Sequence, residues 1–230
     1  MPPKLSILVP AFNEERTVEA LLRRVAAVPL PVVKELVVVD DGSTDGTWRV
    51  LQGLRLEGMV LMRHEANRGK GAAVRTALRA ATGELTVIQD ADLEYDPADL
   101  PTLLAPLLDG RADAVYGSRF LGGPHRVHLF WHYLANAGFT LLTNLLYNVN
   151  LTDMGVGYKA FRTEALRAMS LRSERFGFEP EVTAKACKGR LRLYEVPISY
   201  SGRSYAEGKK ITWRDGLTYL WCLLRFRVSD

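Results

Sequence analysis

Residues 87–97 read Val-Ile-Gln-Asp-Ala-Asp-Leu-Glu-Tyr-Asp-Pro, and this segment indicates both a strand and the chemistry at its end. An apolar run at residues 85–89 ends in two carboxylates, Asp90 and Asp92, which stand one residue apart. Side chains two positions apart on an extended chain point the same way. The two carboxylates are therefore expected to face one point at the end of a strand. Such a pair suits a hard divalent cation, Mg²⁺ or Mn²⁺, beside a diphosphate.

Short β-branched runs alternate with segments of helical periodicity on both sides of this stretch. Strands are expected at residues 5–9, 35–39, 59–62, 85–89 and 114–116, and helices at 15–27, from 44, at 69–81 and at 98–108. Ser43 or Thr44 is expected to cap the second helix. This order predicts an α/β fold, with a mostly parallel sheet between helices. Ligands of such sheets bind beyond the carboxyl ends of the strands.

The pattern changes after residue 120. The sequence predicts an amphipathic helix at 129–149, strands at 158–162 and 192–199, a helix at 179–188, and a basic amphipathic tail at 211–226. We therefore divide the chain into a catalytic domain, 1–205, and a C-terminal tail, 206–230, expected to lie at a membrane interface. For residues 129–149, a core helix and a membrane-contacting helix are equally compatible with the pattern.

Composition limits the possible partners and compartment. The net charge of +4 over 230 residues is mild, and no long run of Lys and Arg indicates a nucleic-acid partner. The two cysteines lack metal-ligand spacing, no apolar run is long enough for a membrane span, and the N-terminus does not read as a signal peptide. These features predict a cytoplasmic setting. They do not predict an oligomeric state.

Five further motifs have both a functional and an ordinary interpretation. Residues 40–45 form either a nucleotide site or a capped turn, and Glu14 in residues 10–14 either contacts a ligand or occupies a first helical turn. The glycine-rich residues 67–71 approach phosphates or only begin a helix. Arg119 clamps an anion or pairs with an acid. Arg203 and Lys209 flank a segment that is either a mobile lid or a solvated turn.

In their order and spacing these motifs resemble family-2 glycosyltransferases of the GT-A fold, most closely the polyprenyl-phosphate sugar transferases, which include the dolichyl-phosphate mannosyltransferases. The resemblance implies a Rossmann-like sheet with the amphipathic C-terminal helix beside it. It also implies roles for individual residues. The nucleotide or metal would be held by Pro10, Phe12, Glu14, Val39, Asp41, Asp90, Ala91 and Asp92, with Glu94 as a third metal contact. Asp92, Arg119, Arg203 and Lys209 would act in catalysis around the phosphates.

The resemblance implies inverting, metal-dependent transfer of a hexose from a nucleoside-diphosphate sugar to a polyprenyl phosphate, dolichyl or undecaprenyl, at the cytoplasmic face of a membrane. GDP-mannose and UDP-glucose are both open as donors. A phosphate monoester is mostly dianionic near neutral pH, so this acceptor needs no general base. Two alternatives remain: a hydroxyl acceptor with Asp153 as the base, and a nucleotide-binding protein without catalysis.

Overall fold

The computed structural model describes residues 2–122, 126, 129–203 and 213–229, without the side chains of 213 and 214. Within these residues seven strands form one sheet in the order β3-β2-β1-β4-β6-β5-β7. Their bounds are β1 (Lys4–Ala11), β2 (Val33–Asp40), β3 (Met59–Arg63), β4 (Leu85–Ile88), β5 (Ala114–Ser118), β6 (Lys159–Arg162) and β7 (Leu193–Pro197). Only β6 among them runs antiparallel to its neighbours, β4 and β5. The predicted α/β fold with a mostly parallel sheet is confirmed.

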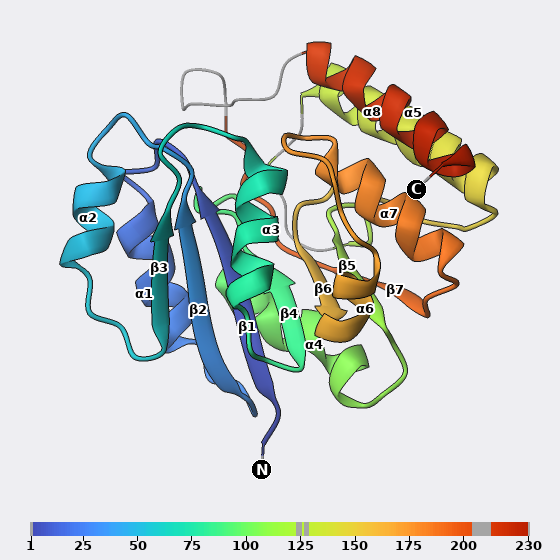
Figure 1. The fold of residues 1–230 in the computed structure, drawn as a ribbon. Helices are drawn as coiled ribbons and strands as arrows, with labels where there is room; N and C mark the ends of the chain where they lie inside the picture. The colour runs from blue at the N-terminus through green and yellow to red at the C-terminus, as the bar shows by residue number, and fades with distance from the viewer. Residues whose placement is uncertain (1, 123–125, 127–128, 204–212, 230) are drawn as a thin grey trace.

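Helices cover the sheet on both sides. They are α1 (Val18–Ala27), α2 (Thr47–Gly53), α3 (Lys70–Ala80), the 3₁₀ turn η1 (Pro97–Asp99), α4 (Leu100–Leu108), α5 (Phe130–Tyr147), α6 (Thr163–Ala168), α7 (Phe178–Lys188) and α8 (Trp213–Val228). Figure 1 shows α3 in front of the sheet and α1 and α4 behind it. Helices α5, α7 and α8 gather at one end of the molecule, where α5 and α8 lie side by side.

The central strands explain why the sheet is buried. Val37, Val38 and Val39 of β2 are fully buried, as are Ile7 and Leu8 of β1. Continuous β-branched and aliphatic runs are typical of parallel strands that helices cover on both faces. The loops that follow β1, β2, β4 and β5 therefore extend from the carboxyl ends of a buried sheet.

The second helix corrects one sequence prediction. It begins at Thr47 rather than at residue 44, and its N-cap is Gly46 instead of Ser43 or Thr44. The Ser43 hydroxyl accepts a hydrogen bond from the Asn13 backbone N–H at 3.0 Å, and the Thr44 N–H donates to the Asn13 side chain at 2.9 Å. Both polar residues therefore join the loop after β2 to the loop after β1. The short helix α6 was not predicted, because six residues carry too little periodicity.

The C-terminal helix packs on the rest of the molecule. Cys222 and Phe226 of α8 are buried against Ala184 of α7 and Tyr147 of α5, and the Tyr147 hydroxyl donates to the Leu223 carbonyl at 2.8 Å. Both α5 and α8 also expose large apolar side chains: Trp131, Leu134, Leu141, Leu145, Leu217, Leu220, Trp221 and Leu224. In the described part of the chain, no helix combines the length and the apolar character needed to cross a bilayer.

Candidate active site

A cavity of about 790 Å³ lies at the carboxyl ends of the parallel strands, with α5, α7 and α8 on its other side. The strand-end loops bring most of the predicted ligand-contacting residues into its lining: Pro10, Phe12, Glu14, Asp41, Asp90, Ala91, Asp92, Glu94, Arg119 and Arg203. Val39 does not line the cavity, because its side chain is buried inside the sheet. Lys209, the proposed lid and the predicted domain boundary lie outside the described residues.

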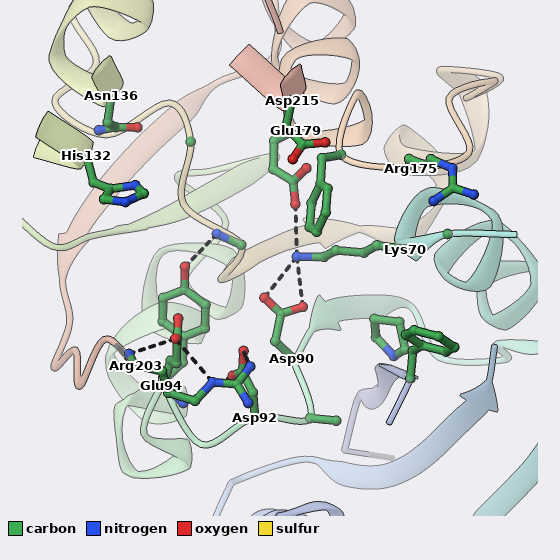
Figure 2. A pocket seen from close by; sticks show the side chains of 18 of the residues that line it. Lys70, Asp90, Asp92, Glu94, His132, Asn136, Arg175, Glu179, Arg203 and Asp215 are labelled. Carbon is green, nitrogen blue, oxygen red and sulfur yellow. Dashed lines mark hydrogen bonds and ion pairs between the residues drawn. The ribbon is translucent and has the colours of Figure 1, made fainter. Parts of the chain in front are cut away.

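Lys70, the first residue of α3, pairs with Asp90. Its ammonium lies 2.8 and 2.9 Å from the two Asp90 oxygens and 2.9 Å from Glu179 Oε1 (Figure 2). Burial alone would lower the pKa of Lys70, but the charges of Asp90 and Glu179 outweigh it and raise this pKa above its usual value. Lys70 therefore stays charged and links the loop after β4 to α7.

Arg203 lies among three further carboxylates. Its guanidinium approaches Asp92 at 2.9 Å, Glu14 at 3.2 Å and Glu94 at 3.3 Å. Burial raises the pKa of the Asp92 carboxyl to about 7, assisted by the neighbouring charges of Asp90 and Glu94 and opposed by Arg203. The excess of carboxylates over cations around Asp92 makes this part of the cavity attractive to a positive ion.

The donor set around Asp90 and Asp92 fits a divalent ion that also binds the ligand. Carboxylate oxygens suit Mg²⁺ and Mn²⁺. The described residues contain no cluster of three His, Cys, Asp or Glu side chains placed to hold a metal by themselves. An ion here would therefore need further oxygens from a diphosphate or water. The sequence predicts that Asp90 and Asp92 face one point, with Glu94 as a third ligand. In the structure Asp90 pairs with Lys70, and Asp92 and Glu94 pair with Arg203, so the metal site stays a prediction.

Asp41 lines the cavity but is already held by protein donors. One carboxylate oxygen lies 2.7 Å from His64 Nδ1 and accepts from the Arg68 N–H at 3.0 Å. The other accepts from the Asn67 side chain at 2.9 Å and from the Gly69 N–H at 2.6 Å. Gly69 has a φ of +94°, which favours glycine. Asp41 thus fixes the loop that starts α3 and positions Lys70, while its contact with a nucleotide stays a prediction.

Arg119 and Asp153 form a buried pair at the cavity wall. Arg119 Nε and Nη2 donate to the two Asp153 oxygens at 2.6 and 2.7 Å, and Asn136 donates to the same carboxylate at 2.9 Å. Asp153 is fully buried. A carboxylate held in this way is poorly placed to accept a proton from an acceptor hydroxyl. The geometry therefore favours a positioning role for Asp153, with Arg119 facing the cavity.

Replacing Asp153 with alanine tests this interpretation through stability. Removing one partner of a buried ion pair leaves the other uncompensated, so we expect Asp153→Ala to lower the free energy of unfolding by about 3 kcal/mol or more. Asp109→Ala, which breaks an exposed pair with Arg111, should change it by less than about 1 kcal/mol. Urea denaturation of both variants measures the difference. An unchanged stability of Asp153→Ala, combined with a loss of activity, would instead favour the role of a base.

Sequence reasoning missed several residues of the cavity wall: Tyr95, Asn136, Glu179, Tyr200 and Tyr219. The Tyr95 hydroxyl accepts a hydrogen bond from the Gly157 N–H at 2.9 Å, and the Tyr200 hydroxyl donates one to Glu94 at 2.9 Å. Asn136, Glu179 and Tyr219 come from three different helices. Helical periodicity identifies such residues as parts of helices and carries no signal for the cavity that they share.

Comparison with known proteins identifies the class of enzyme. Residues 6–169 match the model of glycosyl transferase family 2. The chain belongs to this family and is a glycosyltransferase, as the sequence predicted.

Named relatives agree with this assignment, and a solved structure shares the fold. The chain is 31% identical to the undecaprenyl-phosphate mannosyltransferase of Micrococcus luteus, over 88% of this chain and 85% of that protein. It is also 31% identical to the dodecaprenyl-phosphate galacturonate synthase of Rhizobium johnstonii, over 90% of this chain but only 61% of that protein. Glucosyl-3-phosphoglycerate synthase of Mycobacterium tuberculosis, solved with Mn²⁺, UDP and glucosyl-3-phosphoglycerate, superposes with a TM-score of 0.76 at 23% identity, covering 99% of this chain and 81% of that one. This last likeness supports the GT-A fold alone.

Proposed function

We propose that this glycosyltransferase moves a hexose, with inversion, from a nucleoside-diphosphate sugar to a polyprenyl phosphate. Two relatives, a mannosyltransferase and a galacturonate synthase, are named for a polyprenyl phosphate acceptor, while their sugars differ. Their names therefore support the acceptor class more than any particular donor. GDP-mannose and UDP-glucose both remain candidate donors.

The donor end of the site would lie at Asp90 and Asp92. These carboxylates, with Glu94 as a third contact, would hold Mg²⁺ or Mn²⁺ together with diphosphate oxygens. When bound, such an ion neutralises charge on the departing diphosphate. Pro10, Phe12, Glu14 and Asp41 line the neighbouring wall, where the nucleotide would lie.

The reaction itself needs no proton transfer from the protein. An oxygen of the dianionic acceptor attacks the anomeric carbon, the bond from that carbon to the diphosphate oxygen breaks, and the nucleoside diphosphate leaves. The main obstacle is the approach of two anions. Arg119 and Arg203 line the cavity, and we propose that they and Lys209 lower this repulsion and align the phosphates.

The observation that carries the proposal is the position of the cavity beneath α5 and α8. Residues of both helices line the cavity, and the same helices expose leucine and tryptophan side chains to solvent. Exposed apolar surface on amphipathic helices is typical of contact with a lipid interface. A lipid acceptor anchored in a bilayer could thus present its phosphate to the cavity. We propose that the protein acts as a peripheral protein at the cytoplasmic face of the membrane.

A matched pair of acceptors tests the proposal. The protein is incubated with GDP-mannose or UDP-glucose, a divalent ion, and either a short polyprenyl phosphate or the corresponding polyprenol. We expect a glycosylated product, detected by mass, from the phosphate alone. Equal transfer to the alcohol would contradict the phosphate acceptor, because an alcohol requires a general base.

Membrane contact makes a separate prediction. Leu145→Glu places a charge on an exposed apolar residue of α5, 73% accessible, and we expect it to reduce flotation with anionic liposomes several-fold. Val33→Glu, a change at a 52% exposed position of β2, is the matched control and should float like the unaltered protein. If both variants behave alike, the proposal that α5 contacts the bilayer is wrong.

A further inference from the structure

Glu179, near the start of α7, has one carboxylate oxygen with a partner and one without. Its side chain lines the cavity, yet the residue is only 3% exposed. Oε1 pairs with Lys70 at 2.9 Å, as Figure 2 shows, whereas Oε2 has no hydrogen-bond partner among the described residues. Figure 2 also places Glu179 on the opposite side of the Lys70 ammonium from Asp90.

An unpaired buried acceptor is unfavourable for stability. Leaving such an oxygen without a donor incurs the full desolvation penalty of the group, which is larger when the group is charged. Buried polar groups in folded proteins are rarely left in this condition, so each exception calls for an explanation. Lys70 does not remove the excess charge, because its single ammonium is shared between Glu179 and Asp90.

The surroundings restrict what the missing partner can be. A phosphate group would repel the carboxylate. A metal held by protein side chains needs more ligands than the described residues place here. A neutral hydroxyl group donates a hydrogen bond without adding charge, and it meets both restrictions.

The position of Lys70 points to the source of that hydroxyl. One ammonium separates Glu179 from Asp90, the carboxylate that we place beside the donor diphosphate. The transferred sugar is bonded directly to that diphosphate, so its hydroxyl groups would lie nearby. Because Oε2 is covered as well as unpaired in this structure, a neighbouring side chain of the lining would have to rotate for the contact to form.

We propose that Glu179 binds the transferred sugar, with Oε2 accepting a hydrogen bond from one of its hydroxyl groups. This inference rests on the proposed function and adds a residue that recognises the sugar rather than the nucleotide. A site built to bond a substrate hydroxyl rejects analogues that lack it, because its own polar group is then left unpaired. Glu179 would therefore help to select among donor sugars.

The experiment compares binding of a sugar nucleotide with binding of its nucleoside diphosphate, by calorimetry in the presence of Mn²⁺. GDP-mannose with GDP and UDP-glucose with UDP serve as probes. For Glu179→Ala we expect affinity for the sugar nucleotide to fall about 10- to 100-fold, the range of a hydrogen bond to a charged group. Affinity for the nucleoside diphosphate, which carries no sugar hydroxyl, should fall by clearly less than affinity for the sugar nucleotide.

Two controls test whether the loss of affinity is specific to Glu179 and to a sugar hydroxyl. Glu164→Ala removes an exposed glutamate from the first turn of α6, outside the cavity lining, and should leave both affinities unchanged. Donor analogues that each lack one sugar hydroxyl provide the second control. At least one of them should bind the unaltered protein more weakly than the complete donor does, yet bind Glu179→Ala as tightly as the complete donor does.

The inference would be overturned by an equal loss of affinity for sugar nucleotide and nucleoside diphosphate, or by no loss of either. It would also be overturned if the unaltered protein bound no sugar nucleotide more tightly than the nucleoside diphosphate. These binding measurements contain no acceptor. A failure of the polyprenyl phosphate proposal would therefore appear in the transfer assay and leave this result standing.

Discussion

Asp92→Asn is expected to reduce sugar transfer by at least about 100-fold, because the variant loses a charge that would help to hold a divalent ion at the diphosphate. The substitution keeps the shape of the side chain. It also changes a cluster in which burial, and after it the charges of Asp90 and Glu94, raise the Asp92 pKa to about 7. A steady-state transfer assay at saturating Mn²⁺ measures the effect.

Asp96→Asn provides the matched control. Asp96 lies four residues further along the same loop, outside the cavity lining, and caps η1 through a hydrogen bond from the Ala98 N–H. Asparagine caps helices about as well as aspartate, so we expect its activity to stay within about twofold. Thermal melting of both variants separates lost chemistry from lost folding. Full activity of a folded Asp92→Asn protein would rule out a role for this carboxylate in transfer.

Arg203→Gln is expected to have an effect of similar size, with a different origin. The guanidinium contacts Glu14, Asp92 and Glu94 in the structure and is proposed to align the phosphates of donor and acceptor. Its removal leaves three neighbouring carboxylates to repel the anionic substrates, so kcat/KM should fall by about 100-fold or more.

Arg203→Lys distinguishes charge from geometry at this position. Lysine restores the positive charge but not the planar fork that reaches several oxygens at once, so we expect an intermediate activity. Arg24→Gln, which breaks a largely exposed pair with Asp96, should have little effect. If Arg203→Gln retains the rate and KM of the unaltered protein, Arg203 serves only to pair the acids.

The sequence predicted the parts of the site that follow directly from strand order. Asp90 and Asp92 come after a buried strand, and parallel topology requires the loops after β1, β2, β4 and β5 to meet at one edge. The sequence therefore predicts that the acidic and basic residues of those loops lie together, without giving their contacts.

The remaining parts depend on contacts between distant segments. Lys70 and Glu179 pair although more than a hundred residues separate them, and nothing in the periodicity of α7 marks Glu179 as a cavity residue. Ser43 and Thr44 have the chemistry of helix caps, but Asn13 from another loop binds them instead. The sequence leaves open whether Arg119 clamps an anion or pairs with an acid, and the structure shows that it pairs with Asp153. Local sequence patterns predict helices and strands, but they do not identify which distant side chains pair with one another.

The central claim is that Asp90 and Asp92 bind a divalent ion together with a diphosphate. Electron paramagnetic resonance of Mn²⁺ tests it most directly, by titrating the ion into the protein with and without GDP or UDP. The account predicts weak binding to the protein alone, much tighter binding when the nucleoside diphosphate is present, and loss of that gain in Asp90→Asn and Asp92→Asn. Mn²⁺ binding that is equally tight in all three proteins, or that the nucleoside diphosphates leave unchanged, would contradict it.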